Sequence, residues 1–276
     1  MYGILAQRSL GWDISQNWKD FSVTPSDADD VRVVAQTNGG KRALAFLQLD
    51  MIDEAERELI KLYAENPAMR KTLASFASSL SQAPELSARL AGLRGEIETP
   101  TGQKALYPFP NWTPLNNWKI DKALIYAFVR QESCFKNKAF SNAGARGVMQ
   151  LMPSTAKLMS KKLGEPYRLS KLHRIPYNLM VGQELVSTLL NRKDVNGNLM
   201  AAIAAYNCGT RNLKHWNERA DFKNDPLFFM EAIPSRETRG FVKKVLANYW
   251  IYRSLFGKSL ESVDEVLAGE YPTYRS

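Results

Sequence analysis

The chain has little of what metal sites and membrane proteins are built from. Its 276 residues include only two cysteines and two histidines. His173 and His215 fit no metal-ligand spacing, so we expect no zinc site and no cofactor. The longest apolar run, near residues 199–206, is far short of the roughly 18 to 20 residues of a membrane helix. The length allows one large or two moderate domains, each with its own core.

Acidic residues are missing from one stretch, and this isolates Glu132. Between Ser133 and Gly164 there is no Asp or Glu, while six residues are basic: Lys136, Lys138, Arg146, Lys157, Lys161 and Lys162. Glu132 continues an apolar helical stripe formed at spacings of three and four by Ile125, Phe128 and Val129. Desolvation there would raise the pKa of the carboxyl group, as a general acid near neutral pH requires. A solvated or capping role is the alternative for a single Glu near a helix end.

The charge balance favours an anionic partner. The net charge is +9 at pH 7 and the pI is near 9.4. The Lys and Arg residues are dispersed, without zinc-finger spacing, an RNA-recognition signature or a long basic arm, so we expect no nucleic acid partner. A solvated basic surface explains the charge equally well.

A glycine-containing turn follows Glu132. Gly144 and Gly147 bracket a short polar stretch, where backbone without side chains lets a ligand approach closely. Pro153 is placed to open the next helix. On spacing alone, this turn is equally an ordinary connection.

Four stretches, in this order, resemble the catalytic signature of the soluble lytic murein transglycosylase family. They are Glu132-Ser133 with residues 143–156, then 178–182 (Asn-Leu-Met-Val-Gly), 204–209 (Ala-Ala-Tyr-Asn-Cys-Gly) and 233–242 (Ile-Pro-Ser-Arg-Glu-Thr-Arg-Gly-Phe-Val). The resemblance covers about residues 112–256, and more loosely the helical segment before them. It implies peptidoglycan glycan strands as the partner, and their acidic peptide stems suit the basic charge.

Helical periodicity divides the chain into segments. Apolar residues at helical spacing, such as Ile52, Ala55 and Leu59, predict stacked hairpins of the α-solenoid type over residues 1–97. Asn66 and Pro67 are placed as the cap and first position of a helix. The four prolines of residues 98–118 predict a linker or an extended crossing.

The remainder is predicted to be an all-α domain over residues 119–262, followed by a C-terminal tail, 263–276. Strand alternation of useful length is missing, and helices are expected at about 119–134, 153–163, 176–192, 197–206, 210–217 and 236–256. With Glu132 ending the first long helix, this pattern resembles the goose-type lysozyme fold.

The resemblance implies a reaction that needs one carboxyl group. Glycoside hydrolases usually use two, and Glu132 has no second acid near it in sequence. The family cleaves the β-1,4 bond between N-acetylmuramic acid and N-acetylglucosamine. Glu132 would protonate the leaving oxygen and then take the proton from the muramyl C6 hydroxyl, which closes a 1,6-anhydro ring. The muramyl 2-acetamido group or electrostatic stabilisation would support the oxocarbenium-like state.

Further site residues follow from the same resemblance. Tyr206 would bond the acetamido group or Glu132, and Asn207 would shape its turn. Ser141 and Gln150 would hydrogen-bond sugar or peptide. Buried aromatic packing is the structural alternative for Tyr206.

Two other matched positions are Met152 and Glu237. Met152 would offer an apolar platform to a sugar face, although Met in a core commonly only fills space. Glu237 would contact substrate across the cleft or maintain the hydrogen-bond network, and a local ion pair with Arg236 or Arg239 is the alternative. Ser235 stands where the family prefers an aromatic residue, which leaves the adjoining subsite and the preferred substrate length open.

The cysteines and the amino terminus carry the remaining expectations. Cys134 and Cys208 each lie in a signature motif, where the family usually has a small residue, so a disulfide between them and two free thiols are both open. Residues 1–7 lack the features of a secretory signal, and residues 2–11 resemble an internal helix of the family's superhelical part. We therefore interpret the chain as a fragment or a short member. A periplasmic or cell-envelope location follows from the family alone.

Two other functions stay open. A hydrolytic muramidase would share the fold and the substrate but place water at the anomeric carbon. A noncatalytic helical wall-binding or interaction module would account for the solenoid-like first third. Glu132 argues against the module, because a scaffold needs no acid at that position.

Overall fold

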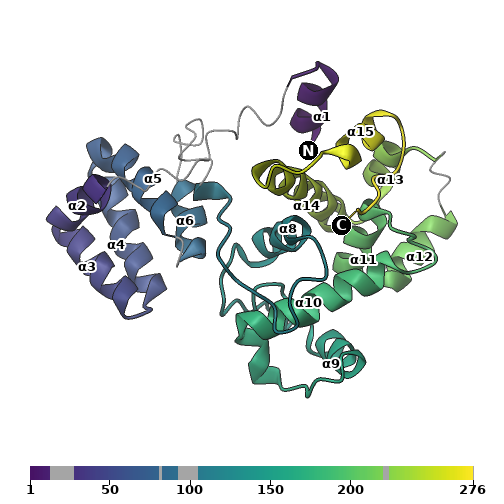
Figure 1. Cartoon of the computed structure of the whole chain (residues 1–276), viewed down its shortest axis with the longest axis horizontal. Coiled ribbons are helices and arrows are strands. Elements are labelled where there is room, and N and C mark those ends of the chain that lie inside the picture. The colour runs from purple at the N-terminus through teal and green to yellow at the C-terminus, as the bar shows by residue number, and fades with distance from the viewer. Residues whose placement is uncertain (13–27, 81–82, 93–104, 220–223, 276) are drawn as a thin grey trace. The chain divides into compact units, whose positions relative to one another are not determined.

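The structure is a computed structural model that describes residues 1–12, 28–80, 83–92, 105–219 and 224–275 (Figure 1). The chain divides into two compact units, a larger one of Met1–Ile14 with Trp112–Ser276 and a smaller one of Ser15–Asn111. In the described ranges, β structure is limited to isolated bridges, so the fold is all-α as predicted. None of the helices in these ranges is long and apolar enough to span a membrane.

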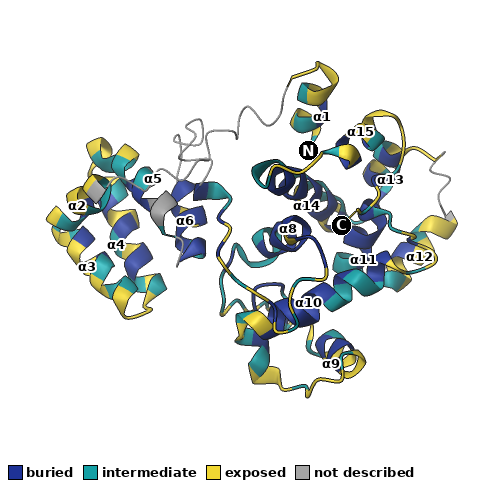
Figure 2. Cartoon of the chain, in the orientation of Figure 1, coloured by how far each residue is buried: buried dark blue, intermediate teal, exposed yellow. Residues whose placement is uncertain are grey.

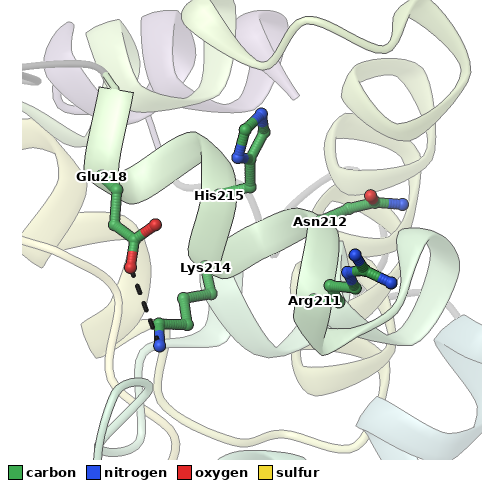
Figure 3. A pocket seen from close by; sticks show the side chains of 5 residues that line it. All are labelled: Arg211, Asn212, Lys214, His215 and Glu218. Carbon is green, nitrogen blue, oxygen red and sulfur yellow. Dashed lines mark ion pairs between the residues drawn. The ribbon is translucent and has the colours of Figure 1, made fainter.

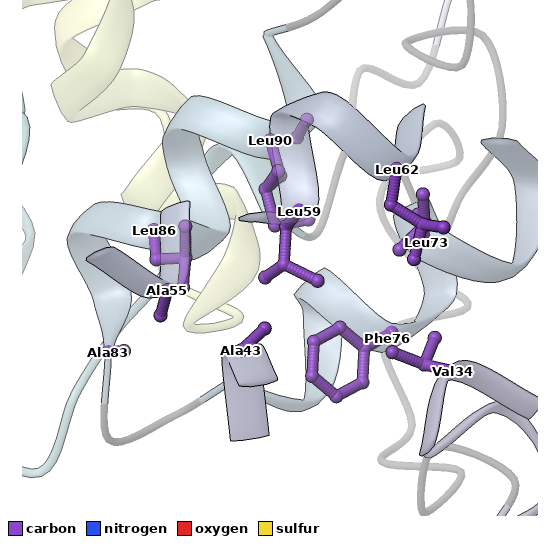
Figure 4. Close-up of a cluster of buried hydrophobic side chains, with 12 residues drawn as sticks. Val34, Ala43, Ala55, Leu59, Leu62, Leu73, Phe76, Ala83, Leu86 and Leu90 are labelled. Carbon is purple, nitrogen blue, oxygen red and sulfur yellow. The ribbon is translucent and has the colours of Figure 1, made fainter. Parts of the chain in front are cut away.

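The smaller unit is a set of packed helices around one apolar core. Its helices are α2 (Ala28–Gln36), α3 (Asn38–Gln48), α4 (Ile52–Glu65), η2 (Pro67–Met69), α5 (Arg70–Ser79) and α6 (Pro84–Ala91). Leu59, Leu73 and Phe76 are almost fully buried at its centre, where Figure 4 shows their side chains gathered. Asn66 precedes Pro67 as predicted but does not cap with its side chain, which instead donates to the Leu62 carbonyl.

The larger unit contains all six helices expected after residue 119, with ends shifted by at most three residues. They are α8 (Lys122–Ser133), α9 (Pro153–Lys162), α10 (Ile175–Leu190), α11 (Leu199–Cys208), α12 (Thr210–Arg219) and α14 (Arg236–Leu255). Its other helices are α1 (Tyr2–Ser9), η4 (Leu169–His173), α13 (Pro226–Ala232) and α15 (Glu261–Leu267). The periodicity missed η4, α13 and α15, because five to seven residues hold too few turns to show a period.

Helix α8 carries the predicted acid and is fixed against α14. Its stripe of Ile125, Phe128 and Val129 is fully buried, as predicted (Figure 2). Asp121 caps α8 by accepting from the Ala123 amide at 3.0 Å. The same carboxylate accepts from Arg253 at 3.0 Å, at the C-terminal end of α14. The first turn of α8 and the last turn of α14 are therefore held together by a buried ion pair.

Two expected segment boundaries differ from the structure. Helix α1, which we assigned to the first helical segment, belongs to the larger unit. Arg8 donates two hydrogen bonds, at 2.7 and 2.9 Å, to Asp264 of α15, and Tyr2 donates to Glu231 of α13. Such pairing between residues distant in sequence leaves no trace in helical periodicity.

The stretch that we interpreted as a C-terminal tail is also part of the larger unit. Thr273 pairs with Asn198 in an isolated bridge. Arg275 forms ion pairs with Glu261 and Glu265 of α15. Part of the predicted linker, 98–118, lies outside the described residues, and Trp112 onward belongs to the larger unit.

Candidate functional site

Glu132 lies in the last turn of α8 and lines a cavity of about 310 Å³. The cavity is lined by residues from the ends of three helices, α8, α11 and α14: Gln131, Glu132, Asn207, Arg236, Glu237, Gly240, Phe241 and Lys244. Desolvation by burial, and after it the charge of Glu237, raises the pKa of Glu132 to about 8. The carboxyl group is therefore protonated at neutral pH and faces a space that a ligand can enter.

The start of α14 is tied to the end of α11 across this cavity. Ser235 caps α14 by accepting from the Thr238 amide at 3.1 Å. The Thr238 hydroxyl donates to the Asn207 side-chain oxygen at 2.6 Å. In the described part of the chain, the Asn207 side-chain nitrogen has no partner, which leaves it as a donor at the cavity wall. Glu237, in the first turn of α14, is exposed and has no ion-pair partner in the same part of the chain.

Tyr206 is not among the residues that line the cavity. Its hydroxyl donates to the Met149 carbonyl at 2.7 Å. Its ring packs against Phe128, with centroids 4.5 Å apart, and stacks on Phe241 at 6.4 Å. Burial, and then the Glu132 charge, raises the pKa of Tyr206 well above its ordinary value. The hydroxyl proton is thus donated to the backbone, and the bond to the acetamido group or to Glu132 stays a prediction.

The Met149 carbonyl belongs to a turn, residues 146–151, that several elements hold in place. Ser133, directly after Glu132, donates through its hydroxyl to the Val148 carbonyl at 2.8 Å. Asn178 of α10 accepts from the Met149 amide at 2.9 Å, and its nitrogen donates to the Arg146 and Leu172 carbonyls at 3.1 and 2.8 Å.

Two glycines allow this close approach. A Cβ at Gly147 (φ 75°) would lie 2.1 Å from the Leu172 carbonyl oxygen, and one at Gly182 would lie 2.1 Å from the Met149 sulfur. Both end residues of the family-like stretch 178–182, Asn178 and Gly182, therefore contact the turn.

The other predicted contacts lie between α8 and α9 and do not line the cavity. Gln150 has a left-handed backbone (φ 44°), and its side-chain nitrogen donates to the Gly147 carbonyl at 2.9 Å. The Ser141 hydroxyl accepts from the Ala145 amide at 2.9 Å, so it closes a turn. Met152 precedes α9 with 41% of its surface exposed, so it does not fill the core. Of the seven predicted residues, the cavity brings together Glu132, Asn207 and Glu237.

Sequence reasoning missed five cavity residues: Gln131, Arg236, Gly240, Phe241 and Lys244. Four of them lie on α14, at positions that share one face of a helix with Glu237. Their spacing was a usable signal, since the matched stretch 233–242 already placed Glu237 at the site.

A second hollow, of about 500 Å³, lies beside α12 (Figure 3). Arg211, Asn212, Lys214, His215 and Glu218 line it, all from this one helix. Lys214 pairs with Glu218 at 3.7 Å in an exposed pair one helical turn apart. None of the predicted site residues lies there, so the cavity at Glu132 is the candidate active site.

Cys134 and Cys208 are half-buried and form no disulfide in this structure, so of the two alternatives it shows thiols. Burial raises the pKa of the Cys208 thiol, which therefore remains protonated near neutral pH. Groups of three or more His, Cys, Asp or Glu side chains suited to a metal ion do not occur in the described ranges.

Comparison with known families agrees with the geometry. A model of the transglycosylase SLT domain matches residues 113–229, and a model of the soluble lytic transglycosylase helical domain matches residues 232–261. The second match falls on α14 and its neighbours, not on residues 1–97. The soluble lytic murein transglycosylases of Salmonella typhimurium and Escherichia coli K12 are 35% and 33% identical over 141 residues. Each match covers 50% of this chain and 22% of the relative.

Solved structures extend the similarity to both units. The 70 kDa soluble lytic transglycosylase of Escherichia coli aligns over 99% of this chain and 43% of its own, with a TM-score of 0.77 and 23% identity. An inactive mutant of lytic transglycosylase Slt from Pseudomonas aeruginosa aligns over 93% of this chain and 41% of its own, with a TM-score of 0.73 and 26% identity. The lysozyme-like fold with a helical superhelix segment is thus confirmed. This chain, which spans less than half of those solved chains, belongs to the soluble lytic murein transglycosylase family.

Proposed function

We propose that the chain is a peptidoglycan lytic transglycosylase, which cleaves the β-1,4 bond between N-acetylmuramic acid and N-acetylglucosamine and leaves 1,6-anhydromuramyl ends. One observation carries the proposal: the Glu132 carboxyl group has a pKa of about 8 and lines a cavity. A general acid works best when its pKa lies near the working pH, and this group holds its proton at neutral pH.

The proposed reaction uses Glu132 twice and consumes no water. The glycosidic C1–O4 bond breaks as Glu132 gives its proton to O4, so that N-acetylglucosamine leaves with a free hydroxyl. The Glu132 carboxylate then takes the proton of the muramyl C6 hydroxyl while O6 bonds to C1. The acid returns to its starting state, and the ring oxygen or the 2-acetamido group shares the positive charge between the two steps.

The other site residues have supporting roles in this proposal. The Asn207 nitrogen would donate to the sugar, a role supported by the bond from Thr238 to the oxygen of the same amide. Glu237 keeps the Glu132 proton in place through its negative charge. Tyr206 holds the turn 146–151 in place. Ser141, Gln150 and Met152 stay proposed contacts for parts of the substrate beyond the cavity.

The substrate also implies where the protein works. Murein forms the bacterial cell wall, and the curated relatives are named for their action on it. We therefore infer a location in the periplasm or the cell envelope. The partner in this proposal is the glycan strand with its attached peptides.

Replacing Glu132 with Gln tests the proposal. Gln keeps the size of the side chain but can neither give nor take a proton, so we expect turnover of purified sacculi to fall by about 10³-fold or more. Binding to sacculi in a pelleting assay should be unchanged. A variant that keeps a large fraction of its activity would contradict the assignment. Intact binding without any turnover by the unmodified chain would instead favour a noncatalytic wall-binding module.

A hydrolytic muramidase is the second candidate, because a second carboxylate, Glu237, lines the same cavity. In inverting glycosidases a second carboxylate activates water on the opposite face of the sugar. Mass spectrometry of the released fragments separates the two reactions. Anhydro ends are lighter than reducing ends by one water, and a product mixture of reducing ends alone would establish hydrolysis.

A further inference from the structure

The positive charge of the chain is concentrated in one stretch of the larger unit. Residues 133–183 contain nine Lys and Arg residues and one acid, Glu165, so they carry +8 of the net charge of +9. The cations themselves are spread along the sequence, and the excess arises because acids are missing from this stretch. The stretch includes α9 and η4, which both pack against α10, and the proposed reaction uses neither of these two helices.

Helix α9 turns a cationic face with an exposed leucine towards solvent. Met159 and Ser160 are buried on its inner side. Lys157, Leu158 and Lys161 are exposed on its outer side, at spacings of three and four that make them neighbours (Figure 2). Leu158 has 61% of its surface exposed. Neither of the two lysines has a carboxylate partner among the described residues.

The segment after α9 extends this surface. The Tyr177 hydroxyl of α10 lies 2.7 Å from the Ser160 hydroxyl of α9 and 3.4 Å from the Pro166 carbonyl oxygen. Tyr177 therefore connects this segment to the second half of α9. Arg168 and Leu169 follow in the chain, and both are exposed, Leu169 with 41% of its surface. We define the basic-leucine surface as Lys157, Leu158, Lys161, Arg168 and Leu169.

Helix α12 is also exposed and cationic, but it differs from α9 in two respects. Its outer face carries Arg211, Lys214 and Glu218, and none of its large apolar side chains is exposed in the described part of the chain. Lys214 pairs with Glu218 at 3.7 Å, whereas on α9 only Lys162 is paired, with Glu184 at 2.7 Å. A face that only meets water gains nothing from exposed leucines, because their contact with water is unfavourable. The α9 surface therefore suits a partner that is both anionic and apolar.

We propose that the basic-leucine surface binds the surface of an anionic lipid bilayer. Its cations suit the phosphate groups of lipid headgroups, and each one strengthens binding roughly fivefold near an anionic membrane. Leu158 and Leu169 suit the boundary between headgroups and acyl chains, which an anionic polymer in water does not offer. The inference goes beyond the proposed reaction, because the contact involves neither Glu132 nor the cavity.

Vesicle sedimentation with the full chain tests the proposal. We expect the chain to pellet with vesicles of phosphatidylglycerol and phosphatidylcholine, but not with phosphatidylcholine alone, at about 0.1 M salt. Lys157→Gln combined with Lys161→Gln should weaken this binding roughly 25-fold. Leu158→Gln keeps the charge and should weaken it roughly three- to tenfold, because an apolar group no longer enters the boundary.

The matched control is Arg211→Gln combined with Lys214→Gln, which removes two exposed charges from α12 instead. This variant should bind the vesicles like the unmodified chain. Turnover of purified sacculi should be the same in all of these proteins. Urea denaturation should also be the same, because substitutions of exposed side chains rarely alter stability.

Four results would overturn the proposal. The unmodified chain might fail to pellet with the anionic vesicles, or both double variants could lose equal affinity, which would reduce the effect to net charge. Unchanged binding by Leu158→Gln would indicate recognition of charge without insertion into a bilayer. Weaker binding of Lys157→Gln with Lys161→Gln to sacculi, with vesicle binding unchanged, would assign this surface to the glycan strand and its peptides instead.

Discussion

At the residue scale, the site depends on the pKa of the Glu132 carboxyl group, which its surroundings raise. Glu132 continues a buried stripe of α8, and burial is the main cause of its raised pKa. Glu237 adds to the effect from the opposite helix, because a second negative charge nearby disfavours ionisation. Tyr206, whose pKa is also raised by burial and then by the charge of Glu132, donates its hydroxyl proton to the Met149 carbonyl.

The pH dependence of turnover follows from these two causes. Because the pKa of Glu132 is raised to about 8, the protonated acid is present below that pH, and kcat/KM should fall as pH rises through about 8. Glu237→Gln removes the charge that helps to raise this pKa, so the alkaline limb should move to lower pH. The pKa of Glu132 should fall only part of the way to its ordinary value of 4.5, because burial is the larger cause of the raised pKa.

The matched control is Glu218→Gln, which removes an exposed carboxylate on α12, outside the cavity. Its alkaline limb should coincide with that of the unmodified chain. A limb that stays in place in Glu237→Gln would contradict electrostatic coupling between the two cavity carboxylates.

At the element scale, the turn 146–151 links three helices, α8, α10 and α11, of which α8 and α11 line the cavity. Ser133 of α8, Asn178 of α10 and Tyr206 of α11 each bond to its backbone. A turn without regular structure is held in one conformation only if its buried backbone groups find such partners. The glycines at 147 and 182 let those partners come close enough.

Asn178→Ala tests this arrangement. It removes one acceptor and two donor contacts, and it takes the Asn178 partner from the Met149 amide and the Leu172 carbonyl in a buried region, while the Arg146 carbonyl still accepts from the Leu151 amide. We expect the free energy of unfolding of the larger unit to fall by about 3 kcal/mol, at about 1 kcal/mol for each hydrogen bond. Urea denaturation measures this change. Asn191→Ala, at the exposed end of the same helix, should change stability by less than about 0.5 kcal/mol, and an equal effect of both would exclude a special role for Asn178.

At the scale of the whole molecule, two separate segments of the chain form the larger unit. The first contains helix α1, which packs on α15, and the second begins at residue 112, after the smaller unit. Each unit has its own set of fully buried side chains. We therefore expect the two units to unfold as separate transitions.

Leu59→Ala probes that separation. Leu59 is fully buried in the core of the smaller unit, so its truncation should lower the stability of that unit by about 3 kcal/mol. Turnover and the transition of the larger unit should not change. Leu246→Ala makes the same truncation in the core of the larger unit and should lower that transition instead. A single transition that both variants shift equally would show that the units unfold together.

Much of the fold and part of the site could be predicted without coordinates. The stripe at Ile125, Phe128 and Val129 predicted a buried helix ending at Glu132, because apolar residues at spacings of three and four mark one face of a helix in the sequence alone. The four matched stretches placed Glu132 and Glu237 in one site, and both line the cavity. The helices longer than about seven residues after position 119 were found for the same reason.

Only the tertiary structure decided which groups remain available for chemistry. The Tyr206 hydroxyl is used by a carbonyl 57 residues away, and Asn178 serves a turn 29 residues away. It also set the proton affinity of Glu132 and the place of α1 in the larger unit. Local spacing determines which face of a helix is apolar, whereas desolvation and hydrogen-bond partners depend on what packs against that face from elsewhere in the chain.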